Sequence, residues 1–157
     1  MKEAKVYIGI DPGQAGGIAL LGEDSVEVHK MPATEHDIWE IFAATWSLKY
    51  FALIEKVHSM PGQGVASTFK FGKGYGFLRG CLVAAGCPFD EVTPQKWQRG
   101  LDIPKRKTTE TKTQFKNRLK QKAQQLYPTV DVTLATADAI LIAHYAKNCR
   151  PAGGGGQ

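Results

Sequence analysis

The sequence predicts an α/β protein whose mixed five-stranded sheet combines a three-strand antiparallel meander with parallel strands and is flanked by helices. Three short apolar runs joined by tight turns fill the first 31 residues, a pattern typical of a meander. Later strands alternate with helical patterns, which favours parallel pairing. With 157 residues, the chain has the length of one domain. We place this domain at residues 1–149 and expect 150–157 to be a disordered Gly-rich tail.

The elements are expected in the following order. KVYIGID, from Lys5 to Asp11, is an apolar strand that ends at Pro12-Gly13, and two further strands lie in GGIALL and SVEVHKM. A helix is expected from Glu35 to Leu48, because its apolar residues recur near helical spacing. The remaining expected elements are a buried strand over 50–57, a loop over 59–64, a helix over 69–85, a short strand over 91–93, and helices over 108–126 and 135–147.

The charge distribution favours a polyanionic partner. Net charge is +5 and the pI is about 9.1, and the stretch from Pro104 to Lys122 contains eight cations but only one acid, Glu110. A solvated helix face would normally mix both signs, so phosphate contact is the favoured interpretation and a solvated face the alternative. The residues expected to bind DNA here are Lys105, Arg106, Lys107 and Lys112.

Other features concern the cellular compartment. The three cysteines are scattered and form no zinc-binding spacing, which favours reduced thiols. No apolar run approaches the roughly 20 residues of a membrane span, and the N-terminal residues do not resemble a signal peptide. We therefore expect a cytoplasmic protein, of a bacterium or a phage-infected host, or an organellar matrix protein, and not a secreted one.

Three acidic residues occupy unusual positions. Asp11 ends an apolar strand, Glu55 interrupts a buried one, and Asp138 lies among alanine, isoleucine and leucine in a predicted helix. A buried carboxylate needs a cation or hydrogen bonds. Singly, each acid could be a cap or face water, but the three together suggest a shared divalent cation site. Carboxylate oxygens suit Mg²⁺ or Mn²⁺ better than zinc.

The glycine-rich turn after Asp11 has two interpretations. Glycines after an acid allow the backbone to approach a phosphate closely, and a similar turn occurs in actin-like and sugar-kinase ATPases as well as in nucleases. The ATPase architecture needs two related domains, whereas this chain supplies only one, and it has no GxxxxGK[ST] loop. We therefore expect no nucleotide cofactor.

Four blocks together resemble the RuvC-type Holliday junction resolvases of the ribonuclease H-like superfamily, particularly their phage and chloroplast branch. In order, they are IGIDPGQAGGIAL, ALIEKVHSMPGQGVASTFKFGKGYGFLRG, VTPQKWQ and ATADAILIAHYA. The resemblance covers roughly residues 7–146. It implies a ribonuclease H-like fold, with Asp11, Glu55 and Asp138 as catalytic residues that bind two Mg²⁺ or Mn²⁺ ions. It further implies a homodimer that cuts two opposite strands of a four-way DNA junction.

The chain departs from the family pattern near its last acid. Related resolvases usually carry a further acid or histidine a few residues earlier, whereas the nearest acid here is Asp131, seven residues before Asp138. Three alternatives follow: three carboxylates suffice, Asp131 joins them through a turn, or catalysis is weakened. We favour the first two. Thr133, as a helix cap, would leave Asp131 outside the helix.

The segment FKFGKGYG also has alternative interpretations. Phe69, Phe71 and Tyr75 could be core residues of a helix, but by resemblance the segment approaches the junction centre, where aromatic rings can stack on bases. Lys73 would then contact DNA, and 69–85 would form the dimer interface. His58 and His144 are interpreted as structural, and the tryptophans Trp39, Trp46 and Trp97 as core or dimer-interface residues.

The leading hypothesis is therefore a junction-resolving endonuclease that hydrolyses the phosphodiester with two metal ions. The alternatives are a noncatalytic branched-DNA-binding protein of the same fold and a ribonuclease H-like nuclease acting on RNA–DNA hybrids or flaps.

Overall fold

The computed structural model describes residues 5–45, 49–57 and 62–149. Its centre is a five-stranded sheet of order β3-β2-β1-β4-β5. The antiparallel meander consists of β1 (Lys5–Asp11), β2 (Gly17–Leu21) and β3 (Val26–Lys30). β4 (Lys49–Glu55) runs parallel to β1, and β5 (Phe89–Val92) runs parallel to β4. The predicted mixed sheet is thus confirmed.

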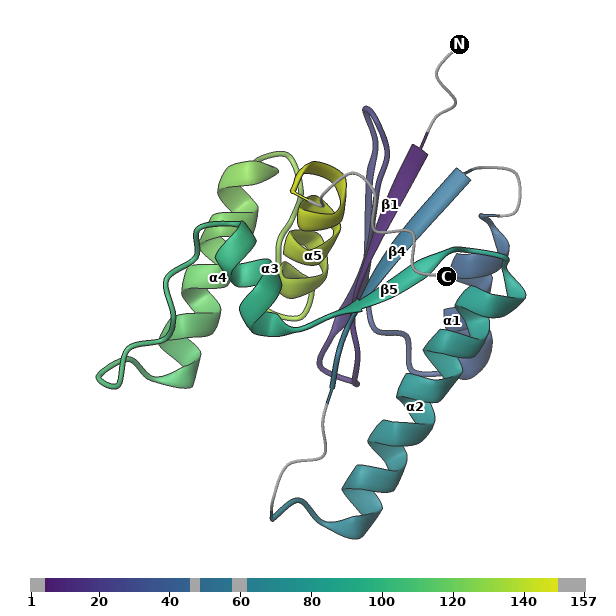
Figure 1. The fold of residues 1–157 in the computed structure, drawn as a ribbon, viewed down its shortest axis with the longest axis horizontal. Helices are drawn as coiled ribbons and strands as arrows, with labels where there is room; N and C mark the ends of the chain where they lie inside the picture. Colours follow the sequence, from purple (N-terminus) through teal and green to yellow (C-terminus); the bar gives the residue numbers. More distant parts are fainter. Residues whose placement is uncertain (1–4, 46–48, 58–61, 150–157) are drawn as a thin grey trace.

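Helices cover both faces of this sheet (Figure 1). α1 (Glu35–Ala43) and α2 (Val65–Ala84) lie on one face, and α3 (Pro94–Gly100), α4 (Lys112–Leu126) and α5 (Ala137–Asn148) lie on the other. The core is correspondingly divided. Ile8 and Ile10 of β1 pack towards α1 and α2, whereas buried residues of α3, α4 and α5 pack together on the opposite side. None of the helices in the described part of the chain is long and apolar enough to cross a membrane.

β1 and α5 pack against each other with their main chains in close approach. A Cβ atom added at Gly9 would overlap the Ala139 carbonyl oxygen and the Ala143 backbone nitrogen. A glycine in β1 and small residues on α5 therefore let the helix lie directly on the strand backbone. Because both contacts involve main-chain atoms, the position of α5 relative to β1 is fixed with little freedom to adjust.

Helix α2 is apolar on two opposite faces. Leu78, Cys81 and Leu82 are buried against the sheet, while on the other side Val65 is 88%, Phe69 75% and Val83 69% exposed. These three align, at helical spacing, with glycines that have open space around them. The exposed apolar stripe, as we call it, consists of Val65, Phe69, Gly72, Gly76, Gly80 and Val83.

Several predicted boundaries were wrong. α1 ends at Ala43, whereas the predicted helix continued to Leu48. Residues 46–48 of that predicted helix lie outside the described range. α2 begins four residues earlier than expected, with Gly64 as its N-cap. α3 was not predicted as a helix; the Thr93 side chain caps it and Pro94 occupies its first turn. α4 begins at Lys112 rather than Thr108, because Thr111 and Gln114 form a capping box there.

Candidate active site

The sheet register places Asp11 and Glu55 side by side. Ile10 pairs with Ile54 on the neighbouring parallel strand, so the next residues, Asp11 and Glu55, lie at the same level, where neighbouring strands are roughly 4.8 Å apart. Alternate strand residues share a face. Gly9 faces α5, and therefore Asp11 does too.

The third carboxylate comes from α5. Asp138 lies in the first turn of this helix, whose start is close to the β1–β2 turn, because a Cβ at Gly17 would contact Ala135 and Thr136. Gly16 approaches Asp11 closely, since a Cβ there would lie 3.1 Å from the Asp11 Cγ. The fold thus brings the three predicted acids together at one edge of the sheet, on the α5 side.

The three carboxylates perturb one another electrostatically. Burial, followed by the charges of Asp138 and Glu55, raises the pKa of Asp11 to about 8. Burial is also the main cause of the rise in the pKa of Glu55 to about 7, to which the Asp138 charge adds, and it raises the pKa of Asp138. Closely spaced, partly buried acids with raised pKa values are typical of functional sites.

Lys116 on α4 is a nearby cation that was not singled out from the sequence. Its charge lowers the pKa of Asp11, of Glu55 and of Asp138, against the larger effect of burial. Lys116 lies one helical turn from the buried Leu119, so it shares the side of α4 that packs towards α5. Its spacing to Leu119 is visible in the sequence, but its proximity to the acids depends on how α4 packs.

Trp97 of α3 orients the carboxylate of Glu55. Its indole Nε1 donates a 2.8 Å hydrogen bond to the Glu55 Oε2, and its ring is fully buried. This confirms Trp97 as a core residue and excludes it from a dimer surface. The bond lowers the pKa of Glu55, opposing burial, and leaves Oε1 available for another partner.

The donor chemistry at this edge fits Mg²⁺ or Mn²⁺, since all three side chains offer carboxylate oxygens and their charges are incompletely balanced. Among the described residues, however, no three histidine, cysteine, aspartate or glutamate side chains are spaced to enclose an ion. The acids therefore interact through space but form an open set of ligands.

Asp131 lies outside α5, as expected, but the capping residue differs from the prediction. The N-cap of α5 is Thr136, because residues 133–137 form a turn in which the Ala137 nitrogen donates to the Thr133 carbonyl. Asp131 is exposed, and its charge is not among those acting on Asp11, Glu55 or Asp138. His144 is structural, accepting or donating a 2.8 Å hydrogen bond with the Tyr127 hydroxyl.

The predicted DNA-binding cations are not equivalent. Lys105, Lys107 and Lys112 have exposed side chains. Arg106 is also exposed, but its Nη1 donates to the Glu110 carbonyl at 3.1 Å. On α2, Lys73 forms an exposed ion pair of 3.6 Å with Glu35.

The three aromatic residues of FKFGKGYG point in different directions. Phe69 is exposed on the apolar stripe. Phe71 turns inward, because its ring would lie 3.1 Å from a Cβ at Gly13. Tyr75 packs against the core, which favours the core alternative for this residue. Among the described residues, its hydroxyl has no hydrogen-bond partner of ordinary geometry, and burial, with the nearby Glu91, raises its pKa to about 12. His58 lies outside the described residues.

Comparisons with known proteins place this geometry in context. No protein-family model matches the sequence, and no curated protein sequence is significantly similar to it. Solved structures do match: T. thermophilus RuvC in complex with Holliday junction substrate aligns over 90% of this chain and 95% of its own, with a TM-score of 0.59 and 16% identity. The chain has the ribonuclease H-like fold of RuvC. A second structure of Thermus thermophilus RuvC gives a TM-score of 0.57 at 17% identity, with the same two coverages. The RuvC fold predicted from the sequence is therefore confirmed, and the similarity extends over nearly the whole length of both chains.

Proposed function

We propose that this protein is a metal-dependent endonuclease that resolves four-way DNA junctions by paired, symmetric cuts. The observation that carries the proposal is the meeting of Asp11, Glu55 and Asp138 at one edge of a RuvC-like sheet. T. thermophilus RuvC has been solved with a Holliday junction substrate, which supports a branched DNA as the partner of this chain.

Each site residue has a role in this proposal. Asp11, Glu55 and Asp138 would hold two Mg²⁺ or Mn²⁺ ions, which when bound would supply activation of a water molecule and neutralisation of phosphate charge. Trp97 fixes one Glu55 oxygen by its hydrogen bond and so reduces the freedom of that ligand before an ion arrives. Lys116 offsets part of the repulsion among the acids, and its charge is available to the phosphate that reacts beside them.

The proposal includes a homodimer formed through α2. The exposed apolar stripe presents glycines to solvent, and small residues let two helices approach closely. Two identical subunits related by a twofold axis match the two symmetric cuts of a four-way junction. Phe69 would then lie near the interface, close to the junction centre, while Lys73 would flank it.

The experiment is incubation of the protein with a mobile four-way junction and Mg²⁺ or Mn²⁺. Paired nicks at symmetric positions are the expected result. A gel shift without nicks would instead support a noncatalytic branched-DNA binder of the same fold. Cleavage of an RNA–DNA hybrid or a flap in place of the junction would support the third hypothesis.

Variants separate binding from cutting. Asp11→Asn and Glu55→Gln should abolish nicking while junction binding persists, because the acids hold the ions and the basic surface holds the phosphates. Asp24→Asn, an exposed acid in the β2–β3 turn, is a matched control that should cut normally. Near-normal cutting by Asp11→Asn would contradict the site assignment.

A further inference from the structure

The basic loop before α4 is held by a single arginine. Residues 103–111 contain no regular helix or strand, yet Arg118 of α4 reaches back to them. Its Nε and Nη2 donate to the two carboxylate oxygens of Glu110, both at 3.0 Å. Its Nη1 donates to the Pro104 carbonyl at 2.8 Å, and its guanidinium lies 4.8 Å from the centre of the Phe115 ring. The guanidinium of Arg118 is therefore occupied by partners within the protein and is not free to bind a phosphate.

Glu110 is the acidic partner of Arg118 in this ion pair. Besides the two bonds from Arg118, its Oε2 accepts a 3.3 Å hydrogen bond from the Lys107 backbone nitrogen, and its carbonyl accepts from Arg106. The hydrogen bonds from Arg118 are the main reason why the pKa of Glu110 is lowered. Glu110, the only acid of the basic stretch, thus connects the loop to α4 through its pair with Arg118. A bidentate arginine–carboxylate pair is strong and fixes the relative orientation of its two partners.

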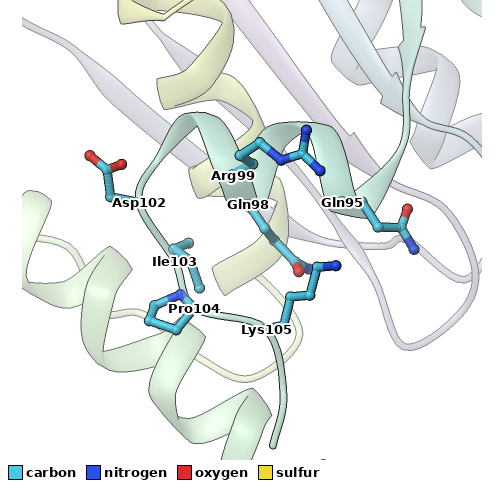
Figure 2. A pocket seen from close by; sticks show the side chains of 7 residues that line it. All are labelled: Gln95, Gln98, Arg99, Asp102, Ile103, Pro104 and Lys105. Atoms are coloured by element: carbon cyan, nitrogen blue, oxygen red, sulfur yellow. The ribbon is translucent and has the colours of Figure 1, made fainter.

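The loop forms one wall of a hollow of about 290 Å³, and α3 forms the other (Figure 2). Gln98 and Lys105 point towards each other across it, and Asp102 points away. Lys105 is a charged donor, and Gln95, Gln98 and Arg99 add amide and guanidinium donors. The helix that carries these amide and guanidinium donors also carries Trp97, whose indole binds Glu55, so α3 links the hollow to the candidate active site.

We propose that Glu110 and Arg118 are positioning residues for DNA binding, holding the loop so that Lys105, Gln98 and Arg99 together receive the phosphodiester backbone of a DNA arm. This inference rests on the proposed function, since it takes DNA as the partner. It predicts a change in DNA affinity opposite to the one that net charge alone would give. Removing an acid from a basic surface would ordinarily strengthen the binding of a polyanion, whereas removing Glu110 weakens it, because a mobile loop must be ordered again on binding.

The experiment compares junction affinity, at several salt concentrations, for the wild type and three variants. Glu110→Gln removes the ion pair. Arg118→Lys keeps the net charge but removes the fork of hydrogen bonds. Glu23→Gln is the matched control, since it makes the same chemical change at an exposed acid in the β2–β3 turn. We expect about tenfold weaker binding for Glu110→Gln and for Arg118→Lys, and a log–log salt slope reduced by about one unit, the change expected for one lost phosphate contact. Glu23→Gln should bind as well as the wild type or slightly better.

Two further readouts distinguish positioning from a loss of folding. Trypsin should cut after residues 105–107 faster in Glu110→Gln and Arg118→Lys than in the wild type, while the melting temperature changes little. The double variant, Glu110→Gln with Arg118→Lys, should bind the junction no more weakly than the weaker-binding single variant, because both changes remove the same interaction that holds the loop. Wild-type protein that does not bind the junction would defeat the proposed function itself. Normal wild-type binding together with equal or tighter binding by Glu110→Gln would overturn this inference alone.

Discussion

Replacing Asp11 by asparagine should stabilise the metal-free protein. Asp11 is partly buried beside two other acids, and its pKa is raised from 3.8 to about 8. Because the folded pKa is the higher one, stability falls as the pH rises from about 4 to about 8, and the asparagine variant escapes this loss. The rise in pKa sets an upper limit of about 5 kcal/mol at pH 7.5. Burial of the amide and relaxation of the site reduce it, and we expect about 2 kcal/mol, or roughly 4–8 °C for a chain of this length.

The measurement is thermal unfolding followed by circular dichroism in the presence of a chelator, at pH 7.5 and at pH 5. The gain should shrink to roughly a third at pH 5, where less of the titration window has been crossed. Adding Mn²⁺ should raise the melting temperature of the wild type much more than that of Asp11→Asn, since an ion that binds only the folded state stabilises it. A melting temperature for Asp11→Asn that equals or falls below the wild-type value at pH 7.5 would refute the electrostatic reasoning. Asp24→Asn again serves as the control.

Three more predictions follow from the site. Gly9→Ala should destabilise the protein by about 3 kcal/mol or more in urea unfolding, because the new methyl group meets main-chain atoms of α5; a cost below 1 kcal/mol would show that α5 can move. Lys116→Met should raise the Mn²⁺ concentration needed for half-maximal cutting and move the pH profile upwards, because its charge lowers all three pKa values and ligands bind metal in their ionised form; an unchanged profile would remove Lys116 from the site. Asp138→Asn should lose essentially all cleavage of one junction at fixed Mn²⁺, whereas Asp131→Asn should lose less than about 10-fold, below the scale of an outer-shell partner, because Asp131 is exposed and its charge acts on none of the three acids; equal and complete loss would make Asp131 a ligand.

The fold was predictable because its signals are local. Apolar runs ending at Pro12-Gly13 and at the turns of the meander indicate strands directly, and acids such as Glu55 within apolar runs stand out because burial of charge is costly. Two of the errors have identifiable physical reasons. α4 starts late because the capping box of Thr111 and Gln114 begins the helix at Lys112, and Arg118 binds Glu110 in the loop that precedes it. α3 has only seven residues, too few to show a helical period.

The candidate site was predictable only in part. Its acids follow from the sequence, but Trp97 as the partner of Glu55 does not, since 42 residues separate them and only the packing of α3 brings them together. The same holds for Lys116, which looked like one cation among eight. The alternative roles of Phe69 and Tyr75 could be separated only when α2 was seen to be apolar on both faces.

The direct contact between β1 and α5 has a consequence for finding distant relatives. Acidic residues near the ends of strands are common, so three of them make a weak search pattern. Here the first acid is preceded, two residues earlier, by Gly9, and the last is followed by Ala139 and Ala143, the residues that Gly9 touches. A search pattern that requires these small residues together with the acids specifies the close approach of the β1 and α5 main chains as well as the carboxylate side chains. It should recover chains of this kind at identities where the acids alone do not distinguish them from chance.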